Sequence, residues 1–176
     1  HYPLRRQRQM CIRDRPTIAT KVYLDDGRFA LASVPSGAST GQKEALELRD
    51  GEKEFGGKGV NIAIKNVNDV LAKLLEGKNV YNQEEIDQIM IDADGSEFKS
   101  NLGANAILSV SLAVAKAGAR AMKIPLHQYF NDMYENISGN ETDQVLPTPM
   151  LNILNGGEHA DNNIDLQEFM IIPCAS

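Results

Sequence analysis

Residues 102–122 form the segment that most constrains the fold. This run is apolar almost all the way round a helical projection and contains many alanines. A helix of that composition is buried on several sides, with neighbouring backbones close to it. The rest of the chain must therefore supply layers that cover this helix.

An alternating pattern over residues 17–34 predicts a β-hairpin ahead of this helix. Ile18, Val22 and Leu24 share one face of the first strand, and Lys21 and Tyr23 share the other. Asp26-Gly27 predicts a two-residue turn, because glycine tolerates a positive φ. The second strand runs over residues 29–34 and ends at Pro35, which cannot donate to a strand ladder.

Helical periods follow the hairpin. The spacing of Ser39 and Gln42 suggests a capping box for a short helix over 44–49. Apolar residues at helical spacing predict a helix over 60–75, stopped by Gly77. A capping box of Asn82 and Glu85 predicts the start of the next helix. Pro125 opens a shorter helix through Phe130.

A second domain is expected after a polar linker over residues 131–146. Residues 150–154 and 166–172 are apolar runs of strand length, and a strand pair alone cannot bury both of its faces. A much longer parent chain is therefore expected. The basic string of residues 1–15 fits no helix or strand period and is set aside as a non-native leader. The predicted division is a leader over 1–15, a domain over 16–136, and a linker with the start of a second domain over 137–176.

The charge balance excludes some partners. The net charge is −6, which argues against nucleic acid and anionic membranes as partners. No apolar run has the length of a membrane helix, and no secretory signal is evident. Cys11 and Cys174 show no zinc or disulfide spacing, so a reducing, cytoplasmic location is expected.

Two segments have candidate chemistry, each with a plainer interpretation. The small-residue loop over 36–41 offers a serine hydroxyl to a hard cation, or is simply a capped connection. The segment 155–163 places His159 beside glycines and acids, and is otherwise a solvated loop. Gln167 and Glu168 interrupt an apolar strand, where a carboxylate faces a polar cleft or forms an ion pair. Possible phosphate and calcium loops over 51–59 and 92–95 have the wrong spacing and are predicted turns.

Taken together, the chain from Pro16 onward resembles the enolase family. The resemblance rests on strings that occur in the family's order and at about its spacing: VPSGASTG (34–41), EALELRDG (44–51), GKGV (57–60), LGANAIL (102–108), SLAVA (111–115), NGGEHADNN (155–163) and QEFM (167–170). It implies an α+β fold: an enolase-like N-terminal domain with an antiparallel sheet followed by helices, and then the first strands of a (β/α)8-type barrel. The family's usual first strand is replaced here by Arg13 to Thr17, which removes an edge strand.

The resemblance also implies a function and roles for particular residues. The expected activity is phosphopyruvate hydratase, which dehydrates 2-phosphoglycerate to phosphoenolpyruvate with Mg²⁺. Ser39 would ligate magnesium, Ala38 would shape the lid loop, and His159 would sit against the substrate. Gln167 would contact the substrate, and Glu168 would orient the leaving hydroxyl. The family's lysine base and remaining metal ligands are expected further along a full-length chain, which would form a homodimer or higher homo-oligomer. The alternative is a non-catalytic enolase-like domain that binds or associates without turnover.

Overall fold

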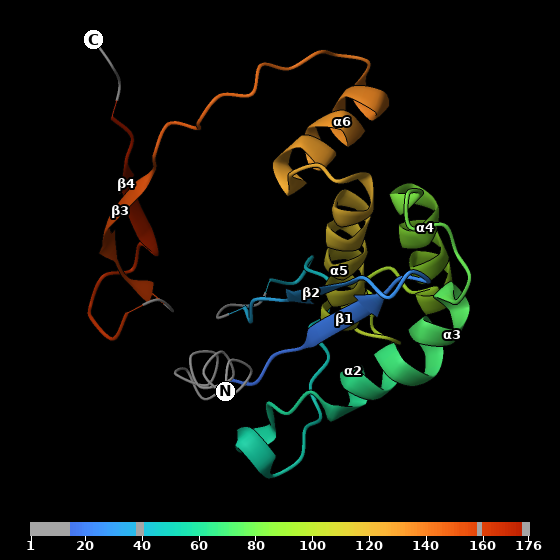
Figure 1. Ribbon diagram of the computed structural model, residues 1–176. Coiled ribbons are helices and arrows are strands. Elements are labelled where there is room, and N and C mark those ends of the chain that lie inside the picture. The colour runs from blue at the N-terminus through green and yellow to red at the C-terminus, as the bar shows by residue number, and fades with distance from the viewer. Residues whose placement is uncertain (1–14, 38–40, 158–159, 174–176) are drawn as a thin grey trace.

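A computed structural model describes residues 15–37, 41–157 and 160–173 of the chain. Its described elements follow the predicted order of a hairpin, a group of helices and a second hairpin (Figure 1). Three predicted site residues, Ala38, Ser39 and His159, lie outside these residues. The leader, residues 1–15, also lies outside them except for Arg15, so its assignment stays a prediction.

The first hairpin joins β1 (Ala19–Tyr23) to β2 (Phe29–Ser33) in antiparallel register, with Thr20 opposite Ala32. The predicted strand faces are confirmed, because Ile18 is buried while Lys21 and Tyr23 are exposed. The predicted two-residue turn is wrong. Leu24 donates to the carbonyl of Arg28 at 2.8 Å, and Gly27 donates to that of Leu24 at 2.9 Å. The loop therefore has three residues and ends at Gly27, whose φ is +83°.

The predicted alanine-rich helix is α5 (Ala104–Met122), and it packs against both strands of the first hairpin and against helices before and after it. The predicted helix over 60–75 is a continuous helical run with one wide turn. It comprises α2 (Asn61–Asn66), the π-helical segment η3 (Val67–Leu71) and α3 (Ala72–Leu75). A short 3-10 segment, η2 (Glu54–Gly57), precedes it. Among the helices of the described residues, none is long and apolar enough to cross a membrane.

Two helices differ from the prediction, one in how its start is capped and the other in its length. Helix α4 (Gln83–Asp94) starts after Asn82 as expected, but the capping box is wrong: the Asn82 amide donates to the Glu85 carboxylate at 2.7 Å and caps no backbone group. Helix α6 (Leu126–Ser138) extends into the predicted linker. Side-chain pairs four residues apart support this extra length, such as the 2.8 Å bond from Asn131 to Glu135. The helix ends at Ser138, and Gly139 follows it with φ +69°.

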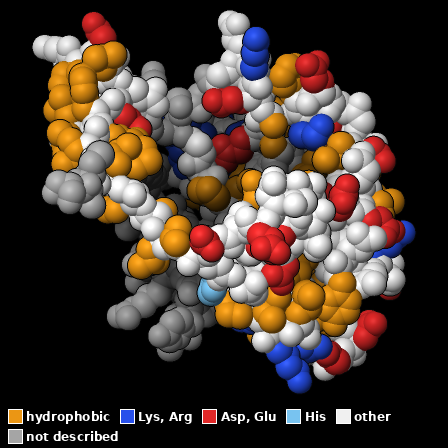
Figure 2. All heavy atoms as spheres, turned by 90° about the horizontal axis from the view of Figure 1, so that it is seen from above, with side chains coloured by type: hydrophobic (Ala, Val, Ile, Leu, Met, Phe, Trp, Pro, Cys, Tyr) orange, Lys and Arg blue, Asp and Glu red, His pale blue; other side chains and the backbone are white. Residues whose placement is uncertain are grey.

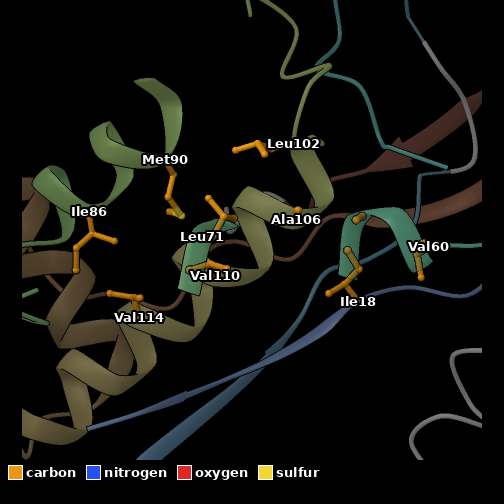
Figure 3. Close-up of a cluster of buried hydrophobic side chains, with 10 residues drawn as sticks. Ile18, Val60, Leu71, Ile86, Met90, Leu102, Ala106, Val110 and Val114 are labelled. Atoms are coloured by element: carbon orange, nitrogen blue, oxygen red, sulfur yellow. The ribbon is translucent and has the colours of Figure 1, made fainter. Parts of the chain in front are cut away.

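The core lies where the first hairpin, the α2–α3 run and α4 meet α5 (Figure 3). Its side chains are Ile18, Val60, Ala63, Leu71, Ile86, Met90, Leu102, Ala106, Val110 and Val114. Leu71 and Met90 are fully buried and point toward each other in Figure 3. Alanines on α5 let these larger side chains approach the helix axis, as the composition predicted.

The predicted helix over 44–49 is wrong. Residues 45–50 form neither helix nor strand, because the start of α5 binds their backbone. Leu46 accepts from the amide of Ala104 at 2.8 Å. The buried side chain of Asn105 accepts from the amide of Leu48 at 3.1 Å and donates to its carbonyl at 3.0 Å. These tertiary hydrogen bonds replace those that a short helix would have made.

The second hairpin joins β3 (Leu151–Asn155) to β4 (Glu168–Ile171). The pair is antiparallel with an irregularity between Asn152 and Leu154, whereas a regular (β/α)8 barrel has parallel strands. Every residue of both strands is exposed. Figure 2 shows hydrophobic side chains crowded over this hairpin, on the left of the view. The observed mixture of antiparallel strands and helices agrees with the predicted α+β class.

Candidate functional site

The described candidate site residues lie at the start of β4. Glu168 is the first residue of that strand, and Gln167 immediately precedes it. In the strand register Glu168 faces Asn155, the last residue of β3. The segment that contains His159 leaves β3 at this point. The hairpin therefore brings the origin of the His159 segment beside Gln167 and Glu168.

Gly156 closes the base of the connection between β3 and β4. Its amide donates to the carbonyl of Gln167 at 3.0 Å, and the amide of Gly157 donates to that of Ile164 at 2.8 Å. A Cβ on Gly156 would lie 2.4 Å from the carbonyl oxygen of Ile164 and 2.5 Å from that of Leu166. Only glycine allows the two chain segments to approach this closely.

Asn162 ties the other end of the connection to β3. Its side-chain amide donates to the carbonyl of Asn155 at 2.9 Å, and its side-chain oxygen accepts from the amide of Ile164 at 3.0 Å. The connection is thus held at both ends by local hydrogen bonds. The string that contains Asn162 was noticed in the sequence, but this positioning role was not predicted, because the partner backbone groups cannot be recognised from composition.

Arg49 organises the start of the 36–41 loop, and sequence reasoning gave it no role. Its guanidinium donates to the Ser36 hydroxyl at 2.8 Å, to the carbonyl of Pro16 at 2.6 Å and to that of Lys58 at 2.7 Å. It also pairs with the carboxylate of Glu47. One planar side chain therefore joins the beginning of the hairpin to its end.

Asp50 fixes the neighbouring helix. Its carboxylate accepts from the amides of Asn61 and Ile62, each at 2.8 Å, and so caps α2 from a distance in sequence. A Cβ on Gly59 would lie 2.3 Å from the Asp50 carboxylate, which explains the glycine. The predicted turn over 51–59 is a pair of turns on either side of the 3-10 segment η2.

The predicted turn at 92–95 is wrong, because residues 92–94 form the last turn of α4 and only Gly95 lies beyond it, with φ +65°. Asp94 has a structural role at this helix end. Its buried carboxylate accepts from the amides of Ser96, Asn101 and Leu102 at 3.0, 3.2 and 2.7 Å, and from the Ser96 hydroxyl. Burial raises the pKa of Asp94, but the hydrogen bonds from Ser96, Leu102 and Asn101 outweigh that effect. The pKa of Asp94 therefore lies below its ordinary value.

The described residues do not by themselves fit a magnesium site. Within residues 15–37, 41–157 and 160–173, no group of three or more histidine, cysteine, aspartate or glutamate side chains could hold a metal ion. The predicted ligand, Ser39, is outside this set.

Comparison with known families agrees with this geometry. Residues 7–130 match the enolase N-terminal domain, which is more than half of the chain. The chain belongs to the enolase family. Residues 143–176 match the enolase C-terminal TIM barrel domain, so the β3–β4 hairpin lies in the part related to the barrel. These matches confirm the resemblance and the predicted fold class. The predicted domain boundaries and site residues stay predictions.

Proposed function

We propose that this chain contributes to a phosphopyruvate hydratase, which dehydrates 2-phosphoglycerate to phosphoenolpyruvate. The observation that carries the proposal is the register of the second hairpin, in which Glu168 faces Asn155. Gln167 and Glu168 therefore lie at the end of the hairpin from which the connection that contains His159 starts. The family membership supports the same reaction class.

The reaction removes a proton next to a carboxylate and expels a hydroxyl group. Glu168 would orient the leaving hydroxyl, since a carboxylate accepts its hydrogen bond. Gln167 would bind the substrate through its amide, and His159 would donate to an anionic group of the substrate. Magnesium, when bound, would supply positive charge to the substrate carboxylate.

Only one magnesium ligand is proposed in this chain, the Ser39 hydroxyl. Ala38 would help to shape the loop that contains it. The described residues form no metal cage of their own. The proposal includes a cytoplasmic location and a homo-oligomeric parent protein. For the chain alone, we expect no turnover of 2-phosphoglycerate with excess magnesium.

A hybrid enzyme tests the reaction. Residues 16–173 would replace the matching segment of an active full-length enolase, and formation of phosphoenolpyruvate would be followed by its absorbance. We expect an active hybrid in which Glu168→Gln and His159→Ala each lower kcat about 10²- to 10⁴-fold. Lys65→Gln is the matched control, because Lys65 is exposed on α2. A folded hybrid without activity would refute the proposal and favour the non-catalytic alternative. Full activity of the Glu168→Gln hybrid would refute the role of Glu168.

A further inference from the structure

Asn155 is followed by Gly156, and this is the only Asn-Gly pair in the sequence. An asparagine in such a pair can lose its side-chain amide, because the next backbone nitrogen is able to attack the side-chain carbonyl carbon. Glycine leaves that nitrogen unshielded, since it has no Cβ. The fold requires glycine here, because a Cβ on Gly156 would lie 2.4 Å from the carbonyl oxygen of Ile164. The hairpin therefore needs the residue that makes Asn155 chemically vulnerable.

The side chain of Asn155 lies where water reaches it. Asn155 is the last residue of β3 and is exposed. Its side-chain oxygen accepts from the side-chain amide of Asn152 at 2.6 Å, which draws electron density away from the carbonyl carbon. This carbon is therefore more open to attack by a nitrogen, and the ammonia that leaves can enter the solvent.

The hairpin restrains the attacking nitrogen. Gly156 is buried, and its amide donates to the carbonyl of Gln167 at 3.0 Å. Asn162 supports this arrangement through its 2.9 Å bond to the carbonyl of Asn155. Hydroxide can take the proton from the Gly156 nitrogen only when the bond to Gln167 opens. Because every residue of β3 and β4 is exposed, this end of the hairpin should open at a small cost in free energy.

We propose that Asn155 is a site of spontaneous deamidation, and that opening of the hairpin end sets the rate. The nitrogen of Gly156 forms a bond to Cγ of Asn155, and the bond from Cγ to Nδ2 breaks. Nδ2 leaves as ammonia with the proton that the Gly156 nitrogen loses, and a cyclic succinimide remains. Water then opens the ring at either of its carbonyls, which gives aspartate or isoaspartate at position 155. Deamidation itself does not require the proposed enolase reaction.

Both products would change the end of the hairpin that carries Glu168. Aspartate would place a second carboxylate directly opposite Glu168, and like charges in this arrangement destabilise a strand pair. Isoaspartate would route the main chain through the side chain and so add a methylene group to the backbone. The amide of Gly156 would then be out of register with the carbonyl of Gln167. Deamidation would therefore loosen Gln167 and Glu168 from β3.

Mass spectrometry of the complete 176-residue chain tests this proposal. The folded chain is kept at mildly alkaline pH in water labelled with heavy oxygen, and fragmentation identifies the product at each asparagine. We expect Asn155 to convert ahead of the other asparagines, with heavy oxygen incorporated and isoaspartate among the products. The rate should rise with hydroxide concentration. The chain in urea gives the rate without the hairpin, and the folded chain should convert about three to a hundred times more slowly.

A variant of Asn162 tests the control by the hairpin. Asn162→Ala removes the bonds to the carbonyl of Asn155 and to the amide of Ile164, but it keeps the Asn-Gly pair. Conversion of the folded chain should become about tenfold faster, while the rate in urea stays the same. Asn163→Ala is the matched control, because Asn163 is the adjacent residue and is exposed. Its conversion rate should equal that of the wild-type chain.

Three results would overturn the proposal. The first is an Asn155 that converts no faster than the other asparagines, or that stays intact in the folded chain beyond about a hundred times its half-life in urea. The second is aspartate as the only product, which would indicate direct hydrolysis of the side-chain amide without attack by Gly156. The third is equal rates for Asn162→Ala and Asn163→Ala, or for the folded chain and the chain in urea, since the hairpin would then not control the reaction.

Discussion

Replacing Asp94 with asparagine should destabilise the domain that supports the candidate site. Asp94 has an exposed fraction of only 2% and accepts three backbone hydrogen bonds at the end of α4. Its bonds shape the turn that leads into Gly103 and Asn105, and Asn105 binds the backbone of Leu48, next to Arg49. A change at Asp94 therefore reaches the base of the 36–41 loop through bonded residues.

The size of the effect follows from the geometry. One carboxylate oxygen accepts from Ser96, and the other accepts from Asn101 and Leu102. An amide keeps only one acceptor oxygen, so at best the Ser96 amide loses its partner at a cost of about 2 kcal/mol. The two remaining bonds lose their ionic character, which brings the total to about 3 kcal/mol. The melting temperature should fall by roughly 6–12 °C.

Urea unfolding followed by far-ultraviolet circular dichroism measures this difference, since the chain contains no tryptophan. Asp92→Asn is the control, because Asp92 is exposed on the same helix and should change stability by less than about 0.5 kcal/mol. The folded-state pKa of Asp94 is lowered, so its contribution exists above the unfolded pKa and is lost as pH falls through the folded one. The wild-type chain should therefore have the larger free energy of unfolding at neutral pH, and this difference from Asp94→Asn should shrink below about pH 4. Equal stability of the two proteins at neutral pH, or an advantage that grows in acid, would refute the reasoning.

Three further predictions concern the supports of the site. Arg49→Met should lower the free energy of unfolding in urea by about 2–4 kcal/mol, because three acceptors lose their donor. An effect as small as that of the exposed control Lys78→Met would contradict this prediction. Gly156→Ala should speed amide hydrogen exchange across residues 155–168 but leave exchange in α5 unchanged, because the added methyl group forces the connection open. Unchanged exchange across residues 155–168 would count against this prediction. The exposed β3–β4 hairpin should make the chain self-associate in light scattering, and replacing Ile153 and Phe169 together with lysine should reduce this. A monodisperse, cooperatively melting wild-type chain at high concentration would exclude that effect.

The parts of the fold that periodicity determines were predicted correctly. The alternation around Ile18 and Lys21 gave the buried and exposed faces of β1, and the alanine-rich run gave α5. In both cases the signal is a repeat along one segment, and burial of that segment requires little knowledge of its partners. The candidate residues Gln167 and Glu168 were found in a similar way, as polar side chains in an apolar strand.

The errors lie where a distant residue decides local structure. Residues 44–49 contain good helix formers, but Asn105, far along the chain, binds the backbone of Leu48 and keeps it out of a helix. The roles of Arg49 and Asn162 were missed for the same reason, because each bonds to backbone carbonyls that the sequence does not mark. Local propensity is a weak guide when tertiary hydrogen bonds satisfy the backbone.

The strings that carry the family resemblance contain many residues that stabilise the fold. Asp50 caps α2, Gly59 makes room for Asp50, and Gly103 would place a Cβ 2.6 Å from that of Leu48. These residues stabilise the fold. A related chain with the same fold but no catalytic activity would need them equally. Stability measurements at such residues therefore test the fold alone. The reaction is tested at Glu168, an exposed residue whose change to glutamine in the hybrid enzyme should lower kcat about 10²- to 10⁴-fold and leave the melting temperature unchanged.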